Sequence, residues 1–140
     1  SEINWKPDLV IASYHGIPKS YFDKGDPYQC YCQKTTRLIS EKMPDIKIQT
    51  TFQSRFGPQE WLQPYTDKTL DNLPNQNIKN VLVLCPGFAS DCVETLEEIN
   101  IQAKESFLKN GGKNFDLIPC LNDSPDHIKL FETLVKKYLV

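Results

Sequence analysis

Several features that would assign a function at once are missing from this sequence. No apolar run approaches the roughly 18 residues of a membrane-spanning helix. The glycine patterns of dinucleotide and P-loop phosphate sites do not occur, so we expect no nucleotide cofactor. A serine within GxSxG, a frequent acyl-transfer nucleophile, is also absent. The formal net charge is only −2 and no basic cluster appears, which argues against a nucleic-acid partner.

The cysteines do not form a familiar framework either. There are five, an odd number, which argues against a disulfide-rich secreted scaffold and favours reduced thiols in the cytoplasm. Cys30 and Cys32 are separated by one residue, whereas zinc and iron–sulfur sites usually have a two-residue gap. A packed thiol is therefore the favoured interpretation, with metal binding by Cys30, Cys32 or Cys92 left open.

Short apolar runs alternate with segments of helical spacing. The strand candidates are residues 8–14, 46–52, 80–86 and 115–121. The helix candidates are residues 28–43, 66–74, 91–110 and 125–139. This alternation predicts an α/β fold with an open, Rossmann-like, four-stranded parallel sheet and helices on both faces. A length of 140 residues suits a single domain, residues 1–140.

Two of the helix candidates carry an apolar stripe, which typically faces a core. The first stripe consists of Val93, Leu96, Ile99, Ala103 and Phe107. The second consists of Ile128, Phe131, Leu134, Val135 and Tyr138. His127 lies early in the last helix candidate, beside Pro125, and we expect it on the surface.

The ends of the predicted strands indicate where a ligand binds. In open α/β sheets, ligands bind beyond the carboxyl ends of the strands. The residues expected to share this edge are His15, Gln53, Ser54, Arg55, Phe88 and Glu94. An edge that combines polar groups with aromatic walls suits a flat, apolar ligand.

His15 and Glu94 are the sharpest candidates for chemistry. An imidazole at a strand end can accept a proton at neutral pH or bind a divalent metal, although it can also serve structure alone. Glu94 follows Asp91 by three residues, so the two could form a helix capping box instead of a site. Glu98 lies one turn further along, and the pair could guide a cation or protons, or belong to a solvated acidic face.

Four motifs carry a strong resemblance to the bacterial ferrochelatases. They are "SYHGIPKSYFDKGDPY", "TTFQSRFGPQEWLQPYTDKTL", "CPGFASDCVETLEEI" and "CLNDSP", and the resemblance runs from about Pro7 to the C-terminus. It implies a chelatase-type fold and the insertion of Fe²⁺ into protoporphyrin IX to form haem, with release of two pyrrole protons. It also implies that this chain is the C-terminal domain of a two-domain enzyme whose N-terminal half is absent, and that the isolated chain is inactive.

The resemblance implies roles for particular residues. His15 and Glu94 match the family's essential, catalytic residues, and Phe88 and Trp61 match aromatic residues of the porphyrin pocket. Gln53, Ser54 and Arg55 match the substrate-binding loop after the second strand. A metal path would include His15, Glu94 and Glu98, although Gln102 stands where some relatives carry another acid. Whether His15 is a proton acceptor or an iron ligand stays open.

The resemblance also sets expectations for cofactors and partners. We expect no tightly bound cofactor, because Fe²⁺ is a substrate, and no [2Fe–2S] cluster, because the animal-type extension with cluster cysteines is absent. The expected partners are protoporphyrin IX, Fe²⁺ and the enzyme's own N-terminal domain. A cytoplasmic location is expected, with peripheral contact to the inner membrane left open. The alternatives are a chelatase for another tetrapyrrole or metal, such as coproporphyrin or cobalt, and a non-catalytic porphyrin- or metal-binding module.

Overall fold

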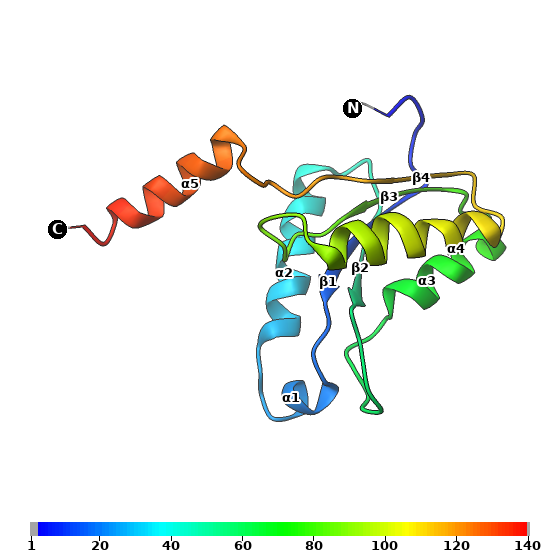
Figure 1. Ribbon diagram of the computed structural model, residues 1–140, viewed down its shortest axis with the longest axis horizontal. Coiled ribbons are helices and arrows are strands. Elements are labelled where there is room, and N and C mark those ends of the chain that lie inside the picture. Colours follow the sequence, from blue (N-terminus) through cyan, green and yellow to red (C-terminus); the bar gives the residue numbers. More distant parts are fainter. Residues whose placement is uncertain (1–2, 140) are drawn as a thin grey trace.

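The computed structural model describes residues 3–139 of the chain. These residues form one parallel sheet surrounded by helices (Figure 1). The strands are β1 (Leu9–His15), β2 (Ile48–Gln53), β3 (Asn80–Leu84) and β4 (Asn114–Leu117). The helices are α1 (Lys19–Asp23), α2 (Tyr28–Lys42), α3 (Thr66–Asn72), the 3₁₀ helix η1 (Leu73–Gln76), the π-helix η2 (Glu94–Ala103), α4 (Lys104–Lys109) and α5 (Pro125–Lys136). The predicted order of strands and helices is therefore confirmed, with the short α1 as an addition.

The four strands form one sheet in the order β2-β1-β3-β4, and every neighbouring pair is parallel. The central strand β1 pairs with β2 on one side and β3 on the other. In the first pairing, His15 is the partner of Gln53, so these two strands end side by side. The predicted open, parallel sheet is confirmed, and its carboxyl edge brings the candidate residues together.

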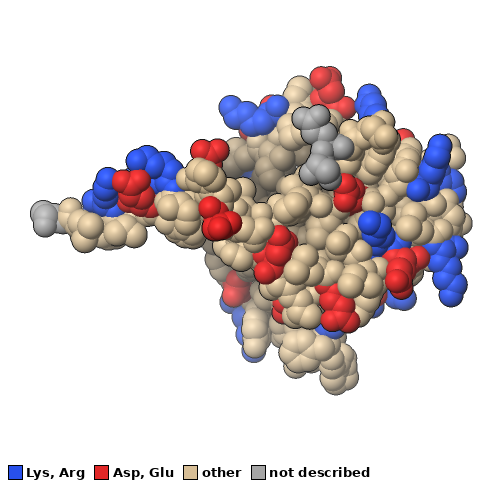
Figure 2. Space-filling view, turned by 45° about the horizontal axis from the view of Figure 1, so that its top comes forward, with Lys and Arg blue, Asp and Glu red and all other residues tan. Residues whose placement is uncertain are grey.

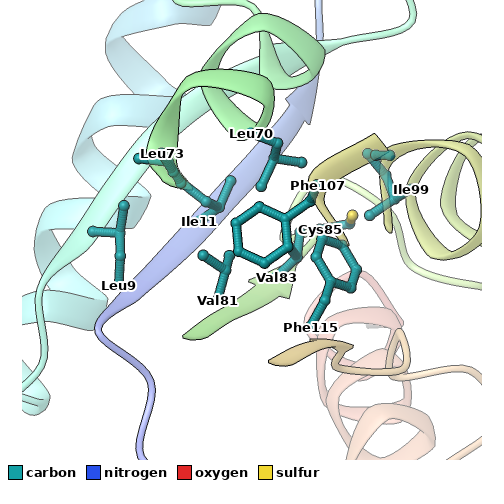
Figure 3. Packing of buried hydrophobic residues seen from close by; sticks show 11 residues of the cluster. Leu9, Ile11, Leu70, Leu73, Val81, Val83, Cys85, Ile99, Phe107 and Phe115 are labelled. Atoms are coloured by element: carbon teal, nitrogen blue, oxygen red, sulfur yellow. The ribbon is translucent and has the colours of Figure 1, made fainter. Parts of the chain in front are cut away.

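Helices cover both faces of the sheet, as predicted. On one face, α3, η1, η2 and α4 pack over the larger core, where Phe107 and Phe115 stack at 5.9 Å between ring centroids (Figure 3). On the other face, Cys32 of α2 packs with Phe52 and Leu62 in a smaller core. The near-continuous apolar sequence of β1 follows from this double coverage.

The apolar stripe predicted for residues 91–110 is only partly correct. Ile99, Ala103 and Phe107 are buried, whereas Val93 is 60% exposed and Leu96 is also exposed. The reason is the π-helical hydrogen bonding of η2, in which each turn contains more residues than an α-helical turn. The buried residues therefore recur every four positions, as Thr95, Ile99, Ala103 and Phe107. The α-helical pattern had instead predicted burial of Val93 and Leu96.

The stripe predicted for the last helix exists but does not face this domain's core. Helix α5 projects from the body of the molecule, and in the space-filling view it forms an arm (Figures 1 and 2). Its large apolar side chains, Ile128, Leu130, Phe131, Leu134 and Val135, are between 41% and 55% exposed. The expectation that this stripe packs on a core is therefore not met within residues 3–139, where these side chains are exposed.

The prediction of a surface position for His127 is wrong. Its side chain is 5% exposed, its Nδ1 lies 2.6 Å from the carbonyl oxygen of Asn122, and its ring lies 4.5 Å from that of Phe131. His127 thus anchors the first turn of α5 to the preceding loop. Within residues 3–139, no helix is long and apolar enough to cross a membrane.

Candidate functional site

The imidazole of His15 lies at the carboxyl end of β1 with one nitrogen free. Its Nδ1 lies 2.7 Å from the carbonyl oxygen of Gly16, and a carbonyl can only accept a hydrogen bond. Nδ1 is therefore the donor, and in the neutral tautomer that carries this proton the lone pair is on Nε2. The Tyr28 hydroxyl donates to the carbonyl of His15 at 2.7 Å and fixes the backbone there. The two contacts fix the orientation of an imidazole whose chemistry allows it to accept a proton or bind a metal.

Two aromatic rings flank this imidazole. The ring centroids of Trp61 and Phe88 lie 6.4 Å and 6.3 Å from that of His15. The Trp61 indole donates to the carbonyl of Phe56 at 3.0 Å, and the Phe56 ring, 75% exposed, lies 5.1 Å from Trp61. The predicted aromatic walls are therefore next to the histidine, with Phe56 as a third ring.

Gly16 is needed for this close packing. A Cβ atom added there would lie 3.1 Å from the carbonyl oxygen of Gln53 and 3.2 Å from the Trp61 ring. Its backbone N–H also donates to that same carbonyl at 2.8 Å. Glycine lets the loop after β1 press against β2, which brings Trp61 towards His15.

Glu94 begins η2 and does not form the capping box that was the alternative to a functional role. The Asp91 carboxylate instead accepts from the Thr95 hydroxyl at 3.0 Å. The pKa of Glu94 is lowered, first by a hydrogen bond from the Cys92 side chain, then by its own backbone N–H, with a further contribution from His15. Glu94 is thus a half-buried carboxylate near the imidazole, and it is ionised at neutral pH.

Glu98 and Gln53 lie in one hydrogen-bonded cluster. The Glu98 carboxylate accepts from the backbone N–H of Ser54 at 2.7 Å and from its hydroxyl at 2.6 Å. The Gln53 amide donates to the carbonyl of Glu94 at 2.7 Å. These contacts bring the end of β2 against η2, so the predicted common edge includes both.

Arg55 borders the cavities beside Glu98, and its guanidinium is paired on the side of α3. Its guanidinium donates to the Asp67 carboxylate at 2.7 Å and lies over the Tyr65 ring at 4.1 Å from the centroid. Because of these two contacts, the side chain is engaged with α3 and with the loop before it. A role for Arg55 in binding a substrate stays a prediction.

Two cavities meet at the Glu98 carboxylate. One, of about 350 Å³, is also lined by Glu94 and Gln102. The other, of about 380 Å³, extends behind η2 towards Asp67 and Asp71. Among residues 3–139, no three His, Cys, Asp or Glu side chains are grouped to hold a metal ion. Carboxylates of η2, together with Arg55, therefore border two adjoining cavities, without a closed metal site among the described residues.

Sequence reasoning missed three contributors to this region. Tyr28 holds the backbone at His15, Phe56 extends the aromatic wall, and Asn122 holds Asp91 at the entrance to η2 through a 2.8 Å hydrogen bond. The only available signal was their position within the quoted motifs. Nothing in their spacing indicated which partner each would contact.

The fold recurs in a solved structure with a distant sequence. The structure of a cobalamin (vitamin B12) biosynthesis CbiX protein from Marinobacter aquaeolei VT8 aligns with a TM-score of 0.57 at 13% identity. The alignment covers 94% of this chain and 96% of that protein. At this identity the similarity concerns the fold alone. It shows that this chain is an α/β domain with the same fold as that protein.

Sequence comparison then specifies the family. The ferrochelatase family model matches residues 2–139, so the chain belongs to the ferrochelatase family. The chain is 58% identical to the ferrochelatase of Rhizobium meliloti (strain 1021) over 139 residues and 57% identical to that of Rhizobium etli (strain CIAT 652) over 141 residues. These alignments cover 98% and 99% of this chain but 41% of each relative. The chain therefore spans about two fifths of the length of these curated relatives.

Proposed function

We propose that this chain is the C-terminal catalytic domain of a two-domain ferrochelatase that inserts Fe²⁺ into protoporphyrin IX. The observation that carries the proposal is the His15 imidazole, held by the Gly16 carbonyl and flanked by the Trp61 and Phe88 rings, near the ionised Glu94. Membership of the ferrochelatase family supports it. The cytoplasm is the expected location of the reaction.

The reaction requires a base to accept the pyrrole protons and side chains that bind the macrocycle. Two pyrrole N–H bonds break, two protons leave, and the ring nitrogens bond the incoming Fe²⁺. His15 and Glu94 are the two groups able to accept protons or to hold the metal on its way to the ring. Aromatic side chains can hold a flat macrocycle in a bent shape that exposes its nitrogen lone pairs, so binding energy lowers the barrier.

The metal would approach along η2. Glu98 lies one turn beyond Glu94, and both border the acidic cavity. Carboxylate oxygens attract a hard divalent cation and release it when a better set of ligands is available. Gln102 continues the same face with a neutral group, and the next carboxylates that line the adjoining cavity are Asp67 and Asp71.

The missing half of the pocket would come from the N-terminal domain. The wall built by Trp61, Phe88 and Phe56 is open on its outer side, since Phe56 is largely exposed. Helix α5 presents a second apolar surface without a partner in the described residues. We therefore expect porphyrin metallation by the two-domain protein and little or none by this chain alone.

The test compares two carboxylates in the two-domain protein, one on η2 and one on α4, which directly follows it. Glu94→Gln removes the charge beside His15, whereas Glu105→Gln removes an exposed charge on α4. Metal insertion, followed by the change in the porphyrin Soret band, should fall about a hundredfold or more in Glu94→Gln and remain unchanged in Glu105→Gln. Equal rates in both variants would rule out the proposed site. Parallel assays with coproporphyrin and Co²⁺ would identify a different substrate.

A further inference from the structure

A buried side chain, that of Gln53, connects the end of β2 to the π-helix η2. Gln53 is 3% exposed. Its Nε2 donates to the carbonyl oxygen of Glu94 at 2.7 Å and lies 3.3 Å from both a Glu98 carboxylate oxygen and the Ser54 hydroxyl. An amide has two N–H groups, so both are used within the protein.

The other end of the same amide is equally engaged. The Gln53 Oε1 accepts from the Ser13 hydroxyl at 2.7 Å and from the Cys85 thiol at 3.6 Å. Burial raises the pKa of Cys85 to about 12, so the sulfur carries its proton at neutral pH. These partners fix the orientation of the amide. The Glu94 carbonyl and the Glu98 carboxylate can only accept hydrogen bonds, so the amide nitrogen must face them, and the amide oxygen faces the hydroxyl and thiol donors. No polar atom of Gln53 is left for a ligand.

The Glu98 carboxylate is held by Ser54, the residue that follows Gln53. One of its oxygens accepts from the backbone N–H of Ser54, and the other accepts from the Ser54 hydroxyl. Ser54 adopts a φ of 64°, a left-handed conformation that is unfavourable for a residue with a Cβ atom. Such conformations persist where the surroundings enforce them. The surroundings of Ser54 are its two bonds to Glu98 and the Gln53 amide, which lies 3.3 Å from both the Ser54 hydroxyl and Glu98.

We propose that Gln53 is a positioning residue, which holds the Glu98 carboxylate and the first turn of η2 against the strand that ends in His15, and that it does not contact the porphyrin. The proposal rests on the proposed function, in which the carboxylates of η2 handle the metal. It predicts that loss of the amide impairs use of the metal and leaves porphyrin binding intact.

The experiment replaces the amide in the two-domain protein. Gln53→Glu keeps the shape, removes both N–H donors and adds a charge beside Glu98. Gln53→Met keeps the length without polar atoms. The matched control is Gln33→Glu, which makes the same chemical change at an exposed position of α2. Metallation rates are measured while the metal and porphyrin concentrations are varied separately.

We expect Gln53→Glu to lower kcat/KM for the metal by about tenfold to a hundredfold, the usual effect of a misplaced group. Gln53→Met should act in the same direction, and Gln33→Glu should match the wild-type protein. The porphyrin KM should stay within about twofold in all three. A raised porphyrin KM with unchanged use of the metal would overturn the inference, since it would show that Gln53 contacts the macrocycle.

A second measurement does not depend on activity. Hydrogen exchange at the Ser54 amide reports whether its bond to Glu98 survives. We expect exchange to accelerate at least about tenfold in Gln53→Met, while the amide of Val81 in the sheet core stays protected, which excludes global unfolding. Unchanged Ser54 exchange in both Gln53 variants would refute the positioning role. If the wild-type protein inserts no metal, the proposed function fails, and this exchange experiment still decides the role of Gln53.

Discussion

The contact between Asn122 and Asp91 offers a quantitative test of how η2 is held. The Asn122 side-chain N–H donates to the Asp91 carboxylate at 2.8 Å, and its oxygen accepts from the Asp91 backbone N–H at 2.8 Å. We consider the substitution Asn122→Asp, which keeps the acceptor and places a second carboxylate where the donor was. Asn122 has a φ of 49°, a conformation that Asp tolerates nearly as well as Asn.

The expected cost has two parts. Loss of a hydrogen bond to a charged group costs about 1.5–3 kcal/mol. Two carboxylate charges about 3 Å apart repel by about 5 kcal/mol at an effective dielectric constant of 20, and solvent at this half-buried site reduces that to about 1–2 kcal/mol. The free energy of unfolding should therefore fall by about 3–4 kcal/mol at neutral pH. Asn122→Gly, which accepts the same φ and adds no charge, serves as the control.

The pH dependence separates the two variants. In the wild-type chain, the pKa of Asp91 lies below its ordinary value of 3.8, with the Asn122 hydrogen bond as the largest cause. This stabilisation is complete above pH 3.8 and is lost as the pH falls through the lowered pKa. In Asn122→Asp the carboxylate pair instead has a pKa above 3.8, so one group takes up a proton as the pH falls and the repulsion disappears.

Urea unfolding of this chain, followed by the fluorescence of the buried Trp61, measures both effects. The destabilisation by Asn122→Asp should shrink by about 0.3–1 kcal/mol between pH 7 and about pH 4.5, because one carboxyl group becomes partly protonated. The destabilisation by Asn122→Gly should stay nearly constant over that interval. A pH-independent cost for Asn122→Asp would refute the argument that two carboxylates face each other there.

Four further predictions concern the site, the loop beside it, the core and the arm. His15→Ala in the two-domain protein should lower the rate of metal insertion about a hundredfold or more while porphyrin still binds, and wild-type turnover would remove His15 from the mechanism. Gly16→Ala should cost about 1–3 kcal/mol in urea unfolding, since its Cβ would meet the contacts at 3.1 and 3.2 Å, and a neutral result would mean that the loop moves freely. Phe107→Ala, at a fully buried position, should cost about 3–5 kcal/mol in the same assay. Ile128→Asp on α5 should change the stability of this chain by less than about 0.5 kcal/mol, yet weaken its association with a separately produced N-terminal domain in a binding titration.

The sheet could be predicted from the sequence because its signals are local. The apolar runs of β1 and β3 are continuous, as expected of strands covered on both faces. The alternation with helical segments then left few topologies to choose from. The common edge of His15, Gln53 and Glu94 followed from the rule that ligands bind at the carboxyl ends of parallel strands.

The details of η2 could not be predicted in this way. Spacing for an α-helix assigned Val93 and Leu96 to the core, but the wider π-helical turn exposes both and buries Thr95. The contacts that hold this turn, from Gln53 and from Asn122, come from residues 41 and 31 positions away from their partners. Their partners are fixed by the tertiary structure, and no periodic pattern in a single sequence reports them.

Helix α5 has a consequence for folding as well as for assembly. Its 12 residues are fewer than an isolated helix needs to be stable in water, and its apolar side chains gain little from the body of this domain. Only the first turn is anchored, through His127. In the free chain the later turns should therefore exchange between helix and coil, and a partner surface that covers them contributes the free energy that completes the helix. For this segment, docking on such a surface and folding would be one event, so a gain in its helical content would report docking.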